Sequence, residues 1–212
     1  MNNLSSFLGF MSSIVSAVTL VVLVNQLRLL RRQISDDHER SRREKALQLL
    51  AKWTDFVSEP GGTAPANFTQ MLSSDQTESL VHSKEFTISE KLKDYIEIWL
   101  ENVGTTDKLK RQEGTDLYVV PRRISALIRR RVAAYLNNLE VIMEAKRHMI
   151  ADPRILHEQF CGYVNPAKNK DMLQKFRKAT AGDGGFPGIE AFMQSVSDGT
   201  HHQASSPLGK TA

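Results

Sequence analysis

The chain has 212 residues, of which 41% are hydrophobic and 25% are charged, a balance typical of one globular domain with appendages. The formal net charge is +4, and residues 1–27 contain no Asp, Glu, Lys or Arg. The single cysteine, Cys161, excludes an internal disulfide, and no internal repeat points to a solenoid. Composition therefore excludes the disulfide-rich, repeat and disordered classes, but it identifies no reaction and no partner.

The first feature along the chain is an uncharged and mostly apolar segment over residues 4–24. As a helix it would be about 30 Å long, which is the thickness of the hydrocarbon core of a bilayer. A cleaved secretory signal needs a basic start and a small-residue cleavage site, whereas this chain begins with MNN and lacks such a site. A buried core helix would show a polar stripe, and this segment offers only Ser, Thr and Gly. We therefore predict a retained transmembrane anchor within residues 1–27.

Basic residues begin only after this segment, with Arg28, Arg31 and Arg32 closest to it. Lys and Arg near a span stay on the cytoplasmic side of the membrane. We therefore expect a single-pass inner-membrane protein with its N-terminus outside and its C-terminal domain in the cytoplasm. The three arginines would lie at the membrane interface and contact anionic headgroups.

Small residues recur every four positions inside the predicted span, at Ser5, Gly9, Ser13 and Ala17. In lipid, such a ridge lets two helices approach closely, so it is a candidate for homo-oligomer formation. A serine-rich span also produces such a ridge by chance, and the sequence does not decide between the two.

A polar segment over residues 28–45 is expected to form a juxtamembrane helical stalk. Its sequence places Asp36 and Arg40, and Glu39 and Arg43, at the i,i+4 spacing of helical ion pairs. Apolar residues at heptad-like spacing run into this stalk from the span: Leu23, Leu27, Leu30 and Ile34. A short coiled coil and a solvated linker helix both fit this pattern.

Residues 46–196 carry a series of segments with apolar residues at helical spacing. We expect helices at 46–57, within 87–104, at 121–150, after 153, after 166 and at 189–196, with short pieces near 68–72 and 77–82. No convincing strand alternation appears. The predicted fold is therefore all-α: a transmembrane helix, a helical stalk and a cytoplasmic bundle of five or six helices. Residues 197–212 are expected to form a disordered tail.

Local signals mark where several of these helices begin and end. Either Ser89 or Thr87 is suited to cap the helix within 87–104, with Glu90 three residues after Thr87 as in a capping box, and Gly104 matches a helix stop. Asp152 followed by Pro153 and Asn165 followed by Pro166 each match a capped helix start.

No combination of residues predicts a catalytic or metal site. His157 and Cys161 lie at the spacing of two zinc ligands, but no third ligand and no orienting group is recognisable. Glu140 and Glu144 form an i,i+4 carboxylate pair, but His148 falls one position too late for the Glu-x-x-His motif of a di-metal bundle. We accordingly expect no cofactor and assign no enzymatic activity.

Arginines are concentrated on the helix expected at 121–150: Arg122, Arg123, Arg129, Arg130 and Arg131. They fit a solvated face with acidic partners, and they also fit an anion-binding or membrane-facing patch. Nucleic-acid modules usually combine such residues with stacking aromatics, and only Tyr135 is near, so nucleic acid is not the expected ligand.

Two longer stretches, "REKALQLLAKWTDF" and "VAAYLNNLEVIMEAKRHMIADPRILHEQF", follow the uncharged start and the polar stalk. Together they resemble, over about residues 28–176, a family of bacterial membrane-anchored helical proteins known only as a domain of unknown function. The resemblance implies an anchored helical protein, and it implies no activity, cofactor or catalytic residue. Asn137, Asn138 and Glu140 are therefore expected only to satisfy turns or neighbouring helices.

The resulting hypothesis is a single-pass, membrane-anchored cytoplasmic helical module that acts in protein interaction or assembly with an unknown protein partner. Two alternatives stay open. One is a membrane-tethered enzyme with an unrecognised site, and the other is a basic binder of anions, nucleic acid or lipid headgroups.

Overall fold

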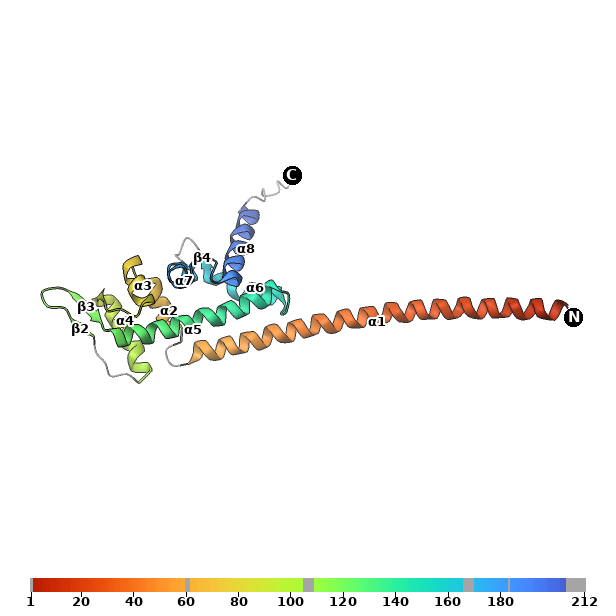
Figure 1. The fold of residues 1–212 in the computed structure, drawn as a ribbon, viewed down its shortest axis with the longest axis horizontal. Helices are drawn as coiled ribbons and strands as arrows, with labels where there is room; N and C mark the ends of the chain where they lie inside the picture. The colour runs from red at the N-terminus through yellow and green to blue at the C-terminus, as the bar shows by residue number, and fades with distance from the viewer. Residues whose placement is uncertain (1, 60–61, 105–108, 166–169, 183, 205–212) are drawn as a thin grey trace, which may run out of the picture.

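The computed structural model describes residues 2–59, 62–104, 109–165, 170–182 and 184–204. Within these ranges, the side chains of residues 2–19, 21, 165, 170 and 199–204 lie outside the description. The described chain is 75% helical and contains eight α-helices, which confirms the predicted all-α character. Figure 1 shows a body of packed elements at one end and a single long helix that projects from it.

The projecting helix, α1, spans Asn2–Ser58 without interruption. It unites the expected anchor, stalk and first body helix in 57 residues, since neither Gly nor Pro occurs between Phe10 and Glu59 to break it. Its last turns are amphipathic as predicted, with Ala46, Leu49 and Trp53 buried in the core. Among the described residues, no helix combines the length and apolarity needed to cross a membrane.

The longest helix of the body, α5, spans Arg122–Arg147 and forms the centre of the core. Its buried residues follow the predicted stripe: Ile124, Ile128, Val132, Tyr135, Leu136, Leu139, Ile142 and Met143. The expected continuation to Met149 and Ile150 is wrong, because both side chains are exposed. The helix ends at Arg147, and Met149 adopts a left-handed backbone with φ of 56° that turns the chain toward the next helix.

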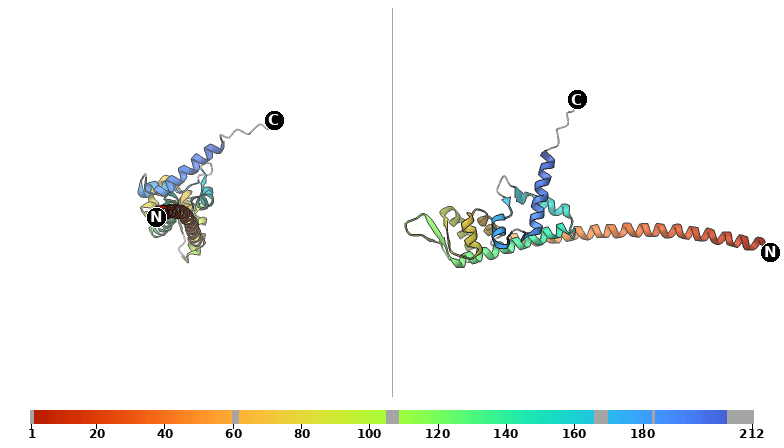
Figure 2. Two further views of the ribbon diagram at one scale, coloured as in Figure 1. Left: turned by 90° about the vertical axis from the view of Figure 1, so that its right-hand side faces the viewer. Right: turned by 45° about the horizontal axis from the view of Figure 1, so that its top comes forward.

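Two contacts show that α5 runs antiparallel to the last third of α1. Arg131 near the start of α5 pairs with Glu59 at the end of α1. Beyond the other end of α5, the backbone N–H of Asp152 donates to the carbonyl oxygen of Arg42 at 3.0 Å. The part of α1 that precedes Arg42 therefore extends beyond the body, as two further views confirm (Figure 2).

Two helices pack against α5, α2 (Ala64–Gln70) and α3 (Ser74–Val81), and α4 (Glu90–Asn102) packs against α2. The predicted capping box at Thr87 and Glu90 is wrong, because Thr87 lies in a strand. The alternative, Ser89, does stand at the N-cap position of α4, although its side chain makes no capping hydrogen bond. The box occurs instead at Ser73 and Gln76, whose side chains and backbone N–H groups bond reciprocally at the start of α3. The predicted stop at Gly104 agrees with its left-handed φ of 74°.

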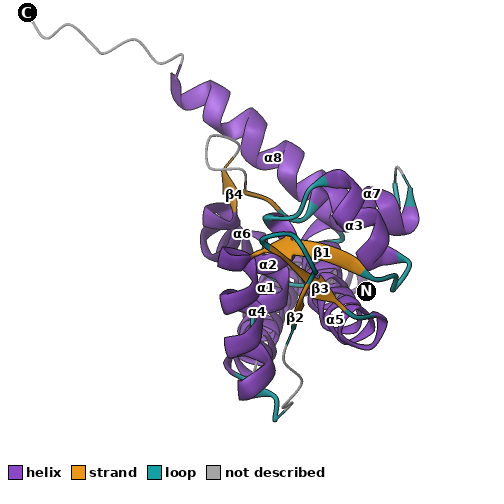
Figure 3. Ribbon diagram, turned by 90° about the vertical axis from the view of Figure 1, so that its left-hand side faces the viewer, coloured by secondary structure: helices purple, strands orange, loops and turns teal. Residues whose placement is uncertain are grey.

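The expectation of no strands is also wrong. A small antiparallel sheet of β1 (Phe86–Ser89), β3 (Leu117–Val120) and β2 (Lys110–Arg111) has the order β1-β3-β2. Phe86 faces Val120 and Lys110 faces Val119 in its register. Strands of two to four residues are too short to show a period-two pattern. The sheet lies at the end of the body opposite the free part of α1 (Figures 1 and 3).

The C-terminal part contains α6 (Pro153–Phe160), the 3-10 turn η1 (Cys161–Tyr163), β4 (Val164–Asn165), β5 (Lys170–Asp171), α7 (Gln174–Ala181) and α8 (Pro187–Ala204). The predicted cap by Asp152 is confirmed, since its carboxylate accepts from the backbone N–H of Arg154 at 2.9 Å.

The helix start expected at Asn165 and Pro166 does not form. Asn165 pairs with Lys170 in a two-stranded ladder, and Pro166 lies outside the described residues. The helix begins later, at Gln174, after Met172 and Leu173 have adopted left-handed backbone. At the C-terminus, α8 extends to Ala204, past the expected boundary at Ser197, and residues 205–212 lie outside the description.

Candidate functional site

The part of α1 that precedes Arg42 and extends beyond the body, called here the free part of α1, is the most unusual surface of the described chain. Half of the exposed large hydrophobic residues lie within its residues 20–34: Leu20, Val22, Leu23, Val24, Leu27, Leu29, Leu30 and Ile34. Leu27 alone leaves 65% of its surface open. Soluble monomers rarely expose apolar residues in such a contiguous group, so this surface is a candidate contact site.

Apolar and basic residues occupy different sides of this stretch. At the helical repeat of 3.6 residues, Leu23, Leu27, Leu30 and Ile34 fall within an arc of about 60°. Arg28 and Arg32 lie roughly opposite that arc. All three of the expected interface arginines, including Arg31 beside the arc, are exposed. The small residues expected to form a ridge, Ser5, Gly9, Ser13 and Ala17, have side chains outside the description.

Two ion pairs along the stalk join residues of α1 to each other. Arg43 pairs with Glu39 as predicted, whereas Arg40 pairs with Glu44 at 3.0 Å instead of with Asp36. These side chains are at least half exposed, so each pair adds little to stability. Most side chains of the stalk are exposed, and Arg42, where the stalk meets the body, is partly buried.

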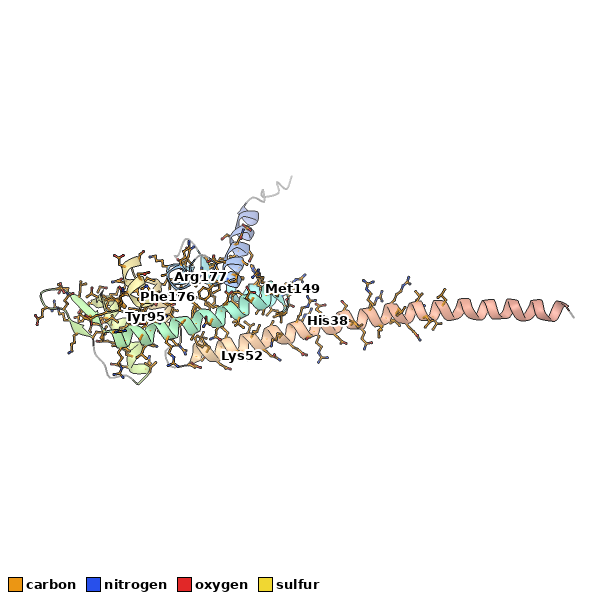
Figure 4. All side chains as sticks on the ribbon, in the orientation of Figure 1. His38, Lys52, Tyr95, Met149, Phe176 and Arg177 are labelled. Carbon is orange, nitrogen blue, oxygen red and sulfur yellow. The ribbon has the colours of Figure 1, made fainter. Side chains whose placement is uncertain are left out.

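The free part of α1 leaves the body beside the turn between α5 and α6. Arg43 Nε lies 3.7 Å from a carboxylate oxygen of Asp152, next to the backbone bond already described. The same end of the body exposes Met149 (Figure 4) and Ile150, with Arg154 close by. The end of the body that faces along α1 toward its N-terminus thus combines exposed apolar side chains with charged groups of both signs.

The arginines of α5 do not act as one group. Arg131 is largely covered, since its guanidinium donates to the carbonyl oxygen of Phe56 at 2.9 Å, pairs with Glu59 at 2.7 Å and stacks 4.1 Å above the Phe56 ring. It therefore caps the C-terminal end of α1, where a cation is favoured by the helix dipole. Arg131 must be removed from the expected anion patch.

The other four arginines of that patch, Arg122, Arg123, Arg129 and Arg130, are exposed. Their i,i+7 spacing places Arg122 with Arg129, and Arg123 with Arg130, on the same side of α5. Because α5 runs antiparallel to α1, this side lies at the end of the body away from the free part of α1 (Figure 1). Whether the four bind an anion stays a prediction.

Of the other sequence candidates, His148 pairs with Glu144 at 2.9 Å on the surface of α5. The ring of His157 packs edge-on against Phe192, and the Cys161 thiol lies 3.4 Å from the carbonyl oxygen of Glu158. Within the described ranges, no three His, Cys, Asp or Glu residues come together as metal ligands would.

Two charged residues have structural roles. Both carboxylate oxygens of Glu140 accept hydrogen bonds from the start of α8, from the backbone N–H of Gly188 at 2.7 Å and of Ile189 at 3.0 Å. The expectation that Glu140 serves a neighbouring helix is thus confirmed. Arg177, only 2% exposed, is the residue that sequence reasoning missed (Figure 4).

Arg177 joins three parts of the C-terminal region. Its side chain donates to the carbonyl oxygens of Met172 at 2.9 Å and Asp171 at 3.3 Å and pairs with Glu190 of α8. It thereby fixes the left-handed backbone at Met172. In the sequence, an arginine in a lysine-rich helix gives no signal of such burial.

A shallow hollow of about 220 Å³ lies between α2, α5 and the segment before α7. It is lined by Thr63, Ala66, Asn67, Gln70, Tyr135, Tyr163, Met172 and Leu173. Burial, followed by the neighbouring Tyr163, raises the pKa of Tyr135 well above its ordinary value, so the phenol stays neutral. No His, Glu or Arg lines this hollow, and it offers no group suited to acid–base catalysis at neutral pH.

No family model matches the chain, and neither a curated protein nor a solved structure matches it. The resemblance to a bacterial domain of unknown function therefore stays an expectation from the sequence.

Proposed function

We propose that this chain is a single-pass, membrane-anchored helical module that holds an interaction domain on the cytoplasmic side of a bilayer. The observation that carries the proposal is the continuity of α1. One helix joins the uncharged residues 2–27 to the buried Ala46, Leu49 and Trp53, and the described residues leave the apolar stretch between them uncovered.

The anchor is supported by the cost of leaving this stretch in water. A fully exposed leucine forgoes about 1.5–3 kcal/mol of burial free energy, and residues 20–34 expose several. Insertion of residues 4–24 into a bilayer would remove the first of these from water and would place Arg28, Arg31 and Arg32 among the headgroups. Met149 and Ile150 then face the membrane from the near end of the body.

An interaction role is favoured over catalysis by how the polar groups are used. The one buried charged side chain in the described chain, Arg177, is bonded within the fold, and Glu140 caps a helix. A continuous helix with neither Gly nor Pro between Phe10 and Glu59 also transmits tilt or rotation from the proposed span to the core. The body would thus present its distal surfaces to partners at a fixed height.

A second function is favoured by the position of the exposed arginines on α5. From Arg28 to the end of α1 are some thirty residues, or about 45 Å of helix. The exposed arginines of α5 lie near the C-terminal end of α1. If α1 stands upright in the bilayer, these arginines are too far away to contact the headgroups of that bilayer. A soluble anionic partner fits this location better than lipid does. Its affinity should fall steeply with added salt.

The anchor is tested by membrane fractionation of the full chain with alkaline extraction. We expect the wild type to stay in the membrane pellet. Val15→Arg combined with Val18→Arg, at the centre of the predicted span, should release most of it, because each arginine costs about 2.5–3.5 kcal/mol there. Leu29→Arg, beyond the span, is the matched control and should stay in the pellet. Recovery of the intact wild type without detergent in the soluble fraction would overturn the proposal.

The orientation is tested separately by reporter fusions after Ile34. A reporter that is active only in the cytoplasm should work there, and one that is active only outside should not. The opposite pattern would reverse the topology while leaving the anchor in place.

A further inference from the structure

We infer that two copies of this chain pair in parallel through one stripe of α1: Leu20, Leu23, Leu27, Leu30 and Ile34, called here the α1 seam. The inference deepens the proposed function and rests on it in one respect, since a shared membrane is what holds the two helices parallel.

The spacing of the seam is that of a helix that packs against a helix. Successive members are separated by three, four, three and four residues, which is the repeat of core positions in a left-handed coiled coil. Each member is exposed, and the described part of the chain has no segment packed over it. The body first packs against α1 further on, where Ala46 becomes buried.

Lipid does not account for the second half of the seam. Leu27, Leu30 and Ile34 are interspersed with Arg28, Arg31 and Arg32, so they lie at the level of headgroups and water if residues 4–24 fill the hydrocarbon core. At that level an apolar row on one side of a helix gains free energy only by packing against another protein surface.

Charge allows that surface to be a second copy. In a parallel pair, the residues that flank the seam bring Gln26 opposite Arg31 of the other copy and Gln33 opposite His38, so no two like charges face each other. Arg28 and Arg32 point away from the seam. In an antiparallel pair the two bodies would lie on opposite sides of the membrane, which a common insertion forbids.

The seam also has a defined end. The next core position after Ile34 is Asp37, and two carboxylates would meet there in a symmetric pair. The helices should therefore separate after Ile34, which leaves room for the two bodies. The pattern thus predicts where pairing stops as well as where it occurs.

Oxidative cross-linking in native membranes tests the pairing residue by residue. In the full chain with Cys161→Ser, single cysteines replace Leu23, Leu27, Leu30 or Ile34 in the seam, and Leu29, Arg32 or Asp37 outside it. We expect the seam cysteines to give at least about five-fold more disulfide-linked dimer than the others, following the 3.5-residue repeat. Equal yields at all positions, or a maximum at Leu29 or Arg32, would overturn the seam.

Capture between two differently tagged copies provides a second readout that needs no cysteine. Leu27→Glu combined with Leu30→Glu should reduce capture at least ten-fold, while Leu29→Glu should retain it. Undiminished capture by the double variant would contradict the inference. Alkaline extraction of the same membranes separates the claim of pairing from the claim of a membrane anchor. A wild-type chain that stays in the pellet but does not pair refutes only the α1 seam. A chain that is released but gives seam-specific cross-links refutes only the anchor.

Discussion

Glu140 and Arg177 show how single charged residues fix the C-terminal helices against α5. The carboxylate of Glu140 supplies both acceptors for the free N–H groups at the start of α8. The guanidinium of Arg177 pairs with Glu190 one turn into the same helix and holds the backbone of Met172. The sequence indicated only that Glu140 would serve a turn or a neighbouring helix, and it gave no signal for Arg177. The partners of these bonds are far apart along the chain or are backbone atoms.

Replacement of Glu140 tests the first of these roles. Glu140→Ala leaves two helix-start N–H groups without an acceptor, and we expect a loss of about 1–2 kcal/mol in the free energy of unfolding. Glu144→Ala is the control on the next turn, because its partners Arg147 and His148 are surface groups. Chemical denaturation should therefore show a clearly smaller loss for Glu144→Ala, and equal losses would contradict the capping role.

Tyr135 gives the protein a specific sensitivity to alkaline pH. Its burial raises its pKa in the folded state above the ordinary value of 10.0, so the folded chain keeps a proton that the unfolded chain releases. The stabilisation is complete below pH 10 and is lost above it, at up to about 1.4 kcal/mol per pH unit. Tyr135→Phe should flatten this decline in thermal melts between pH 10 and 11. An unchanged slope would contradict the burial of the phenol.

At the scale of elements, the sequence was sufficient to predict helices with long apolar stripes. It was insufficient to predict short strands, which are defined by their pairing with one another. The stripes at the end of α1, in α4 and in α5 predicted helices whose faces are buried as expected, and Asp152 predicted the start of α6. The strands were missed because pairing between β1 and β3 defines them, and their four residues carry no pattern alone.

Contacts between elements also explain the errors in helix boundaries. Residues 28–45 read as a separate stalk because their polarity differs from that of both neighbours, yet helical propensity does not depend on polarity and nothing breaks α1. Thr87 matched a capping box by spacing, but pairing with Val119 in the sheet determined its backbone. The later start of α7 depends on Arg177 holding Met172.

The contact between α5 and α8 depends on one glycine. A Cβ at Gly188 would lie 2.8 Å from the backbone nitrogen of Glu144, which cannot move without displacing α5. We expect Gly188→Ala to cost about 1–3 kcal/mol in the free energy of unfolding. Gly162→Ala is the control, because its Cβ would meet nothing within 4 Å. Equal stability of the two variants in denaturant melts would show that α8 is not seated as described.

At the scale of the whole molecule, α1 sets the distance between the two candidate surfaces. Its free part carries the apolar and basic residues of the proposed membrane end, and the same helix ends beside Arg131, where the exposed arginines of α5 begin. These surfaces were recognised in the sequence as compositional features. Their separation to opposite ends of the body follows only from the antiparallel packing of α1 and α5.

The central claim is that one unbroken helix runs from the bilayer into the core of the body. A spin-label scan of residues 20–45 in liposomes, on the full chain with Cys161→Ser, measures it most directly. Labels at residues 20–24 should be accessible to oxygen dissolved in lipid, and labels from about residue 35 onward should be accessible to a water-soluble nickel complex. Accessibility should vary with helical periodicity through the transition between the two regions. Water accessibility at residues 20–24 equal to that at residue 40, or a loss of periodicity between them, would contradict the account.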